Sequence, residues 1–267
     1  MDELTDVSYE VEGGLAWLTI DRPERMNAFR ARTVDELIGC LKRAWASPEV
    51  GVVCLTGAGE RAFCTGGDQK QRAESGDYGP SESGLFEVEY LHRLIREIPK
   101  PVIAAVNGYA IGGGHVLHLL CDLTIASEEA QFGQTGPRVG SFDAGFGTAY
   151  LARVVGEKRA REIWFLCRRY DAGTAERWGL VNKVVPASEL RDEVRRWADE
   201  ILSLSPTALR FLKQSFNADS EHMAGLGQLA FSGLGLFVDS DEAREGVQAF
   251  SEKRQPDFAP YRARVST

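Results

Sequence analysis

Strand-length apolar runs alternating with helical patterns are the feature that most constrains the fold of this chain. Such runs occupy residues 15–20, 50–56, 101–106, 123–126 and 180–185. Continuous apolar runs of this length are typical of strands buried on both faces, as in parallel sheets. The segments between them carry helical spacing or turn signals. The pattern therefore predicts an α/β fold with a parallel or mostly parallel sheet.

Several local signals place helices. Thr33 with Glu36 three residues later forms a capping-box pattern and predicts that a helix begins at Thr33. A polar loop is expected over residues 69–83, followed by a helix over 85–97. A glycine cluster leads into a further apolar helix at 116–120.

The region after Gly145 is mostly helical in pattern. Ser205-Pro206 predicts an N-cap followed by proline in the first turn, and further helices are expected near 223–237 and 240–251. At 267 residues, the chain is long enough for one large domain. We divide it into a core of residues 1–200 and a helical region of residues 201–267, which packs on the core or on a neighbouring subunit.

The charge balance bears on the class of ligand. The net charge is −8, and 26% of residues are charged. Nucleic acids and anionic membranes require an excess of Lys and Arg, so neither is expected as a partner. No uncharged apolar stretch reaches the ~18 residues of a membrane span. The acidic start Met1-Asp2-Glu3-Leu4 lacks the features of a signal peptide, and we expect a cytoplasmic protein that acts on a small molecule.

The five cysteines predict buried, reduced thiols. They are widely spaced, odd in number and form no CxxC pair, and they stand at positions 40, 54, 64, 121 and 167. A disulfide framework or a zinc site is not expected from this spacing.

Two glycine-rich segments are candidates for chemistry. They are Ala-Phe-Cys-Thr-Gly-Gly-Asp at 62–68 and Gly-Tyr-Ala-Ile-Gly-Gly-Gly-His at 108–115. Glycine lets the backbone approach a ligand closely, and a helix start presents unpaired N–H groups. Two such N–H groups can hold a thioester oxyanion, each contributing about 3–4 kcal/mol. Tight turns with no catalytic role are the alternative interpretation.

These motifs resemble those of the crotonase (enoyl-CoA hydratase/isomerase) superfamily. The resemblance runs from Leu15 to Phe258 and rests on Arg22-Pro23, Asn27-Ala28-Phe29, both glycine segments and Cys121-Asp122. It implies a spiral of ββα units with a C-terminal helical extension, a homotrimer or homohexamer, and an acyl-coenzyme A substrate. It also implies an oxyanion hole made by the N–H groups of Gly67 and Gly113.

Two positions argue against simple hydration. Enoyl-CoA hydratases of this superfamily carry one catalytic glutamate just after the triple glycine and another 20 residues later. Here these positions hold Val116 and Gly136, which move no proton.

The segment 132–143, together with 114–118, 161–168 and 253–258, resembles the 1,4-dihydroxy-2-naphthoyl-CoA synthases of menaquinone biosynthesis. Segments 26–30, 57–63 and 244–247 resemble the 2-ketocyclohexanecarboxyl-CoA hydrolases. The synthase forms the bond between a thioester α-carbon and a carbonyl carbon by an intramolecular Claisen condensation of o-succinylbenzoyl-CoA, and the hydrolase breaks such a bond with water. Ring closure is the first expectation and ring cleavage the alternative.

The resemblance also implies residue roles. Bicarbonate would fill the space beside Gly136 and act as general base, held by Gln134, Thr135 and Trp164. Ser141 and Asp143 would bind and protonate the carbonyl or carboxyl group under attack. Tyr78 is the expected active-site loop tyrosine.

The resemblance extends to coenzyme A, which would lie near Arg25, the backbone around Ala28, and Lys253. Solvated surface charge is the alternative reading of the two basic side chains. One departure concerns Val238, because the synthases and the hydrolase have a tyrosine there. Tyr78, Ser232 or water would have to replace its hydrogen bond, or the reaction differs.

Three readings from other classes remain. His115, His118 and Asp122 share a helix face and could ligate a metal, although no metal is expected. Residues 225–230 mimic part of a dinucleotide fingerprint without its preceding strand. A non-catalytic crotonase scaffold is the third.

Overall fold

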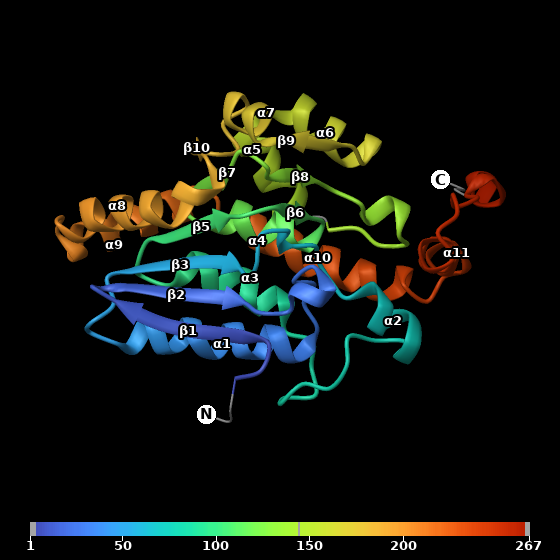
Figure 1. The fold of residues 1–267 in the computed structure, drawn as a ribbon. Coiled ribbons are helices and arrows are strands. Elements are labelled where there is room, and N and C mark those ends of the chain that lie inside the picture. The colour runs from blue at the N-terminus through green and yellow to red at the C-terminus, as the bar shows by residue number, and fades with distance from the viewer. Residues whose placement is uncertain (1–3, 144, 265–267) are drawn as a thin grey trace.

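The computed structural model describes residues 4–143 and 145–264, and it contains two sheets (Figure 1). The larger sheet has the strand order β1-β2-β3-β5-β7-β10. β1 pairs antiparallel with β2, and every other neighbouring pair is parallel. Its strands are β1 (Val7–Glu12), β2 (Leu15–Ile20), β3 (Val52–Gly57), β5 (Val102–Val106), β7 (Leu123–Ser127) and β10 (Lys183–Val185). The predicted parallel sheet and α/β class are confirmed.

The smaller sheet has the order β4-β6-β8-β9. Its strands are β4 (Ala62–Cys64), β6 (Tyr109–Ile111), β8 (Gln131–Gly133) and β9 (Arg169–Asp171). Each has three residues, which is too short to show a periodic pattern, so the sequence did not predict them as strands. β4 and β6 each lead directly into one of the glycine turns, so this sheet positions both of them.

Helices surround the two sheets. They are α1 (Ala31–Ala46), α2 (Gln69–Ser75), α3 (Val88–Glu97), α4 (Gly113–Leu120), α5 (Leu151–Val155), α6 (Glu157–Leu166), α7 (Ala172–Arg177), α8 (Leu190–Leu202), α9 (Pro206–Ala218), α10 (His222–Phe237) and α11 (Asp241–Ser251). Two short helical turns, η2 (Gly136–Arg138) and η3 (Phe146–Tyr150), frame the segment between β8 and α5.

The predicted start of the first helix at Thr33 is wrong. α1 begins at Ala31, and Thr33 occupies its third position. The Thr33 hydroxyl accepts from the Arg30 amide at 3.1 Å and donates to the Asp6 carboxylate at 2.6 Å. Glu36 accepts backbone N–H groups of the segment before β1 instead of closing a capping box. Thr33 therefore caps the helix from its third position, and tertiary contacts with Asp6 and with the start of β1 engage the Thr33 and Glu36 side chains.

The expected polar loop over 69–83 contains a helix, because α2 occupies its first half. Asp68 caps α2 by accepting from the Gln71 amide at 3.2 Å. The helix expected from residue 85 begins at Val88, and the helix expected from residue 116 begins at Gly113.

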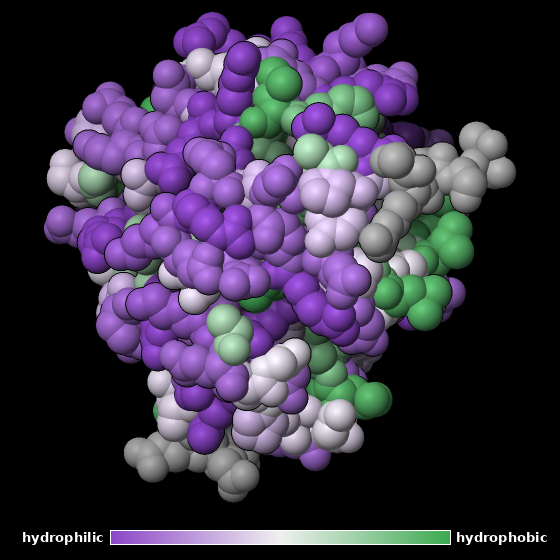
Figure 2. Space-filling model, turned by 90° about the vertical axis from the view of Figure 1, so that its right-hand side faces the viewer, coloured by the Kyte–Doolittle hydropathy of each residue, from purple (hydrophilic) through white to green (hydrophobic). Residues whose placement is uncertain are grey.

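The three C-terminal helices lie where the sequence predicts them, and Ser205 caps α9 by accepting from the Ala208 amide. α9 packs on α3, α10 on α3 and η3, and α11 on α2 and η2. Figure 2 shows the side of the molecule on which α11 lies in Figure 1. This face is mostly hydrophilic, with hydrophobic residues gathered at one side.

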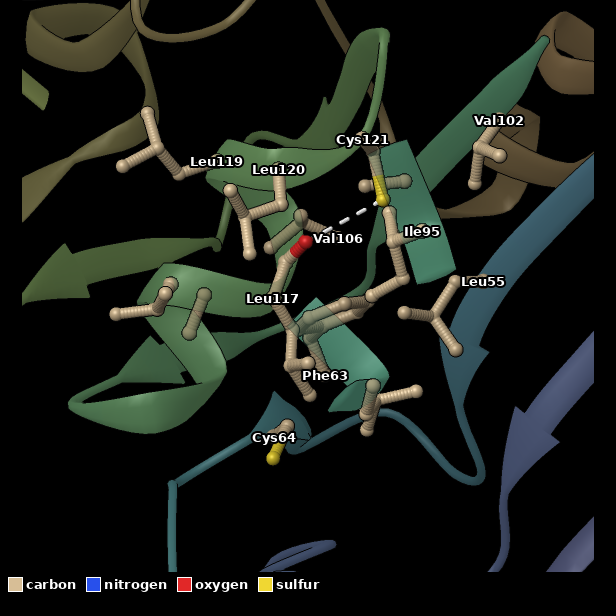
Figure 3. Packing of buried hydrophobic residues seen from close by; sticks show 14 of the residues in the cluster. Leu55, Phe63, Cys64, Ile95, Val102, Val106, Leu117, Leu119, Leu120 and Cys121 are labelled. Carbon is tan, nitrogen blue, oxygen red and sulfur yellow. Dashed lines mark hydrogen bonds between the residues drawn. The ribbon is translucent and has the colours of Figure 1, made fainter. Parts of the chain in front are cut away.

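The core lies between the larger sheet and helices α1, α3 and α4. Figure 3 shows part of it, where the Cys121 thiol donates to the Leu117 carbonyl at 3.3 Å. All five cysteines are free, and four are buried. Burial raises the pKa of the Cys64 thiol to about 12, so this thiol is neutral at physiological pH. The prediction of buried, reduced thiols is confirmed for four, while Cys167 is half-buried.

Among residues 4–143 and 145–264, no helix is both long enough and apolar enough to cross a bilayer.

Candidate active site

One cavity of about 690 Å³ gathers most of the residues that the sequence singles out. Eleven of the twelve predicted site residues line it: Arg25, Ala28, Gly67, Tyr78, Gly113, Gln134, Thr135, Gly136, Ser141, Asp143 and Trp164. Lys253 is not among its lining residues. Val238, at the C-terminal end of α10, is not among them either.

The first glycine turn follows β4. Gly67 forms an isolated parallel bridge with Phe29, in which the Phe29 amide donates to the Gly66 carbonyl at 2.8 Å and the Asp68 amide donates to the Phe29 carbonyl at 2.9 Å. The buried Arg22 guanidinium holds the Asp68 carboxylate at 2.9 Å. These bonds fix the backbone on both sides of Gly67. Its own amide donates to no acceptor among the described residues.

The second glycine turn joins β6 to α4, and each of its glycines has a steric reason. Gly112 has φ +59°, in the left-handed region. A Cβ on Gly113 would lie 2.6 Å from the Phe29 ring, and a Cβ on Gly114 would overlap the Cys64 carbonyl. Gly113 is the first residue of α4, so helix geometry leaves its N–H without an intrahelical acceptor.

The two turns touch each other. A Cβ on Gly66 would come within 2.9 Å of the Gly113 nitrogen. The Gly67 and Gly113 amides, neither of which has an acceptor in the described part of the chain, therefore belong to touching turns that line one cavity. An oxyanion hole requires two unpaired donors placed in this way.

Tyr78 lies against the first turn. A Cβ on Gly67 would meet the Tyr78 ring at 2.5 Å and its hydroxyl at 2.8 Å. The ring stacks on Phe86 with 4.6 Å between centroids, and the Gln69 amide donates to the Tyr78 hydroxyl at 3.4 Å. The loop tyrosine thus lies beside Gly67 in the cavity, while its catalytic role stays a prediction.

Asp143 is a half-buried carboxyl group in the cavity wall. Its Oδ1 accepts from the Gly147 amide at 3.3 Å. Burial raises the pKa of Asp143 to about 7, and the Gly147 hydrogen bond opposes this only in part. A group of this pKa exchanges protons readily at neutral pH, as a general acid or base must.

Close backbone contacts seat the segment that carries Ser141 and Asp143 on the C-terminal helices. Gly140 (φ +67°) lies against Ala243, and a Cβ on Gly246 would come within 2.8 Å of the Gly140 Cα. Gly145 (φ +88°) lies against Gly227 of α10. Helices α10 and α11 therefore help to position the cavity's carboxyl group.

His92 of α3 lines the same cavity, although no sequence motif points to it. Its spacing from Val88 and Ile95 is that of a helix face turned to the core. This spacing predicts that His92 is buried, and it predicts no functional role. Phe231 and Leu234 of α10 also line the cavity.

The alternative metal site is not assembled. His115 and His118 are buried neighbours, 4.9 Å between ring centroids, and burial lowers the pKa of His115 to about 3. Asp122 instead pairs with Lys213 at 2.7 Å. Within the described part of the chain, no group of three or more His, Cys, Asp or Glu side chains could hold a metal ion. The dinucleotide-like segment 225–230 lies inside α10.

Comparison with known proteins shows the family to which this chain belongs. The model of the enoyl-CoA hydratase/isomerase family matches residues 10–260. The chain belongs to this family.

Solved structures of crotonase-family proteins superpose over nearly the whole chain. An enoyl-CoA hydratase from Mycobacterium avium subsp. paratuberculosis is 30% identical, covers 96% of this chain and 100% of its own, and gives a TM-score of 0.85. A carnitinyl-CoA hydratase from Mycobacterium avium is 31% identical, with 96% and 98% coverage and a TM-score of 0.84. An enoyl-CoA hydratase from Bacillus anthracis is 32% identical, with 95% and 99% coverage and a TM-score of 0.73.

The surroundings of Gly136 do not fit the bicarbonate that the synthase resemblance implies. A Cβ on Gly136 would lie 2.8 Å from the Ser141 carbonyl oxygen and 3.2 Å from the Phe142 Cα. An anion placed where a Gly136 Cβ would lie would therefore meet backbone atoms and the negative end of the Ser141 carbonyl dipole. The Trp164 indole N–H already donates to the Gly147 carbonyl at 2.6 Å, and the Gln134 amide nitrogen lies 3.3 Å from His115 Nδ1.

Proposed function

We propose that this crotonase-family protein acts on the bond between the α-carbon of a coenzyme A thioester and a carbonyl carbon. The observation that carries the proposal is Asp143, a half-buried carboxyl group with a pKa of about 7 that lines the same cavity as Gly67 and Gly113. Paired-carboxylate hydration is not proposed, because Val116 is fully buried in the core and Gly136 has no side chain.

Hydrolytic opening of a cyclic β-ketoacyl-CoA is the direction that the chain's own residues support. The Asp143 carboxylate removes a proton from water as the water oxygen bonds to the ring carbonyl carbon. The bond from this carbon to the α-carbon then breaks, and its electron pair passes into a thioester enolate. The Gly67 and Gly113 amides hold the enolate oxygen, and Asp143 returns the proton to the α-carbon.

We place ring hydrolysis before ring closure because hydrolysis needs no general base other than Asp143. Asp143 alone accepts and returns the single proton that hydrolysis moves. The ring-closing reaction described for the synthases uses bicarbonate beside Gly136, and the geometry there does not accommodate it.

Closure of o-succinylbenzoyl-CoA to 1,4-dihydroxy-2-naphthoyl-CoA is the second candidate. Ser141 and Asp143 both line the cavity, as the match over 132–143 implies, and Phe142 and Phe231 add aromatic lining that suits an aryl group. In this direction the α-carbon releases its proton to solvent, the enolate carbon bonds to the carboxyl carbon, and the carboxyl hydroxyl takes a proton from Asp143 and leaves as water.

The substrate's coenzyme A would pass Arg25 and Ala28, which line the cavity. The contribution of Lys253 stays a prediction. A basic side chain near the phosphates would act mainly as a screened point charge, so we expect Arg25→Ala to raise KM more than it lowers kcat.

The test is turnover of two esters, followed by mass spectrometry. Hydrolysis of 2-ketocyclohexanecarboxyl-CoA gives an open-chain diacid ester heavier by one water. Closure of o-succinylbenzoyl-CoA gives a product lighter by one water, and added bicarbonate should not change its rate if the geometry at Gly136 holds. Turnover of neither ester, with rapid hydration of a linear enoyl-CoA instead, overturns the proposal.

A further inference from the structure

His92 is a buried polar side chain without a partner in the wall of the cavity. It is 1% exposed, and neither ring nitrogen has a hydrogen-bond partner among the described residues. Burying a donor and an acceptor without partners is unfavourable, and most buried polar side chains are hydrogen-bonded. The position therefore calls for an explanation.

The surroundings of His92 are apolar and belong to two packed helices. α3 contacts α10, and the imidazole lies 6.1 Å from the Phe231 ring, centroid to centroid. Val88, Phe231 and Leu234 line the cavity with His92. This is a wall suited to a hydrocarbon ring, with one polar group in it.

The imidazole is neutral. Burial lowers the pKa of His92 to about 4, so at neutral pH it offers one N–H donor and one acceptor nitrogen and carries no charge. An uncharged oxygen, in a ketone or a hydroxyl group, suits such a partner. A carboxylate would have to give up its hydration without gaining an opposite charge.

Resting on the proposed acyl-CoA function, we propose that His92 is a specificity-determining residue that hydrogen-bonds an uncharged oxygen on the acyl group, away from the thioester. The chain thereby selects oxygen-bearing carbocyclic acyl groups over plain hydrocarbon ones. Both nitrogens are covered in the structure, and the neighbouring Phe231 is only partly buried. A rotation of Phe231 would open the imidazole to the acyl group.

The experiment compares the binding of two esters by calorimetry. 4-Oxocyclohexanecarboxyl-CoA carries a distal ketone, and cyclohexanecarboxyl-CoA lacks it. Neither has a carbonyl at the β-position, so the proposed cleavage does not consume them. We expect the wild-type protein to bind the oxo ester about tenfold more tightly, the ratio that one net hydrogen bond gives.

Variants separate a binding role from a packing role. His92→Leu should bind both esters with equal affinity, and His92→Gln should keep part of the preference. His118→Leu is the matched control, because His118 is equally buried, has an unpartnered Nε2 and does not line the cavity. It should retain the full preference. His92→Leu should also raise the unfolding temperature, since it removes unpartnered polar atoms.

The outcomes distinguish the two proposals. Equal binding of both esters by the wild-type protein, with 2-ketocyclohexanecarboxyl-CoA still turned over, overturns the role of His92 alone. A preference that survives His92→Leu does the same. If the wild-type protein binds neither ester and turns over neither substrate of the preceding test, both proposals fail.

Discussion

At the scale of single residues, the absence of side chains shapes the site as much as their presence. Gly114 allows α4 to approach β4, and Gly66 allows the two glycine turns to touch. Val116, where the resemblance to hydratases would imply a carboxylate, is fully buried in the core. Asp143 is a half-buried carboxyl group of the cavity, whereas the buried Asp68 carboxylate pairs with Arg22.

The pH dependence of turnover tests Asp143. Hydrolysis needs the carboxylate form, so kcat/KM for the cyclic ketoester should rise with pH through about 7, the folded-state pKa. Ring closure needs the acid form, and its rate should fall over the same range. Asp143→Asn should lower kcat by about 10²–10⁴-fold and remove the pH-dependent limb. Near-wild-type turnover by this variant would contradict the assignment.

The same carboxyl group predicts a pH dependence of stability. A carboxyl pKa raised from 3.8 to about 7 stabilises the fold below pH 4, and this stabilisation is lost as pH rises to 7. Urea titrations of wild-type and Asp143→Asn proteins at both pH values check this. The free energy of unfolding of the wild type should fall relative to that of the variant between pH 4 and 7, and parallel values would contradict the raised pKa.

At the scale of elements, the C-terminal helices hold the Asp143 segment by backbone contact. Gly246→Ala would place a methyl group 2.8 Å from the Gly140 Cα and shift that segment. We expect at least a tenfold loss of kcat with the circular dichroism spectrum unchanged. Gly225→Ala of α10 meets no atom within 4 Å and is the matched control. It should keep full activity and gain up to about 1 kcal/mol of stability, and equal losses in both variants would contradict this account.

The attachment of α9 depends on a buried cation. Lys213 donates to the carbonyls of Ile95 and Lys100 and to the Asp122 carboxylate at 3.1, 3.0 and 2.7 Å. Lys213→Met leaves these acceptors without their donor and should lower the free energy of unfolding by about 3 kcal/mol. Lys42→Met, at an exposed position, should change it by less than about 0.5 kcal/mol. Similar effects of the two substitutions in denaturant titrations would refute the role of Lys213.

At the scale of the whole molecule, exposed apolar residues favour assembly. Leu229 and Leu236 lie on one face of α10 and are 72% and 83% exposed, and Phe216 of α9 is 78% exposed. Exposed apolar side chains gathered on one helix face mark interaction surfaces. The homotrimer or homohexamer, and the assembly role of residues 201–267, stay predictions.

Light scattering tests the assembly. The wild-type protein should have the mass of three or six chains. Leu229→Glu combined with Leu236→Glu should shift it toward the monomer, because charges would be buried at the interface. Gln214→Glu adds a charge at an exposed polar position of α9 and should leave the mass unchanged. A monomeric wild-type protein would rule out this prediction.

The sequence by itself determined strands β2, β3, β5 and β7, the C-terminal helices and both glycine turns, because these depend on local periodicity and backbone freedom. Of the run expected over 180–185, only Lys183–Val185 forms a strand. Eleven of the site residues that the family resemblance implies line one cavity. Only the tertiary structure decided the start of α1, where the Thr33 hydroxyl donates to Asp6, and the backbone contacts of Gly136 with Ser141 and Phe142. It alone placed His92 in the cavity wall. A linear pattern reports which side of an element is apolar, whereas the partner of a buried polar group depends on segments distant in the chain.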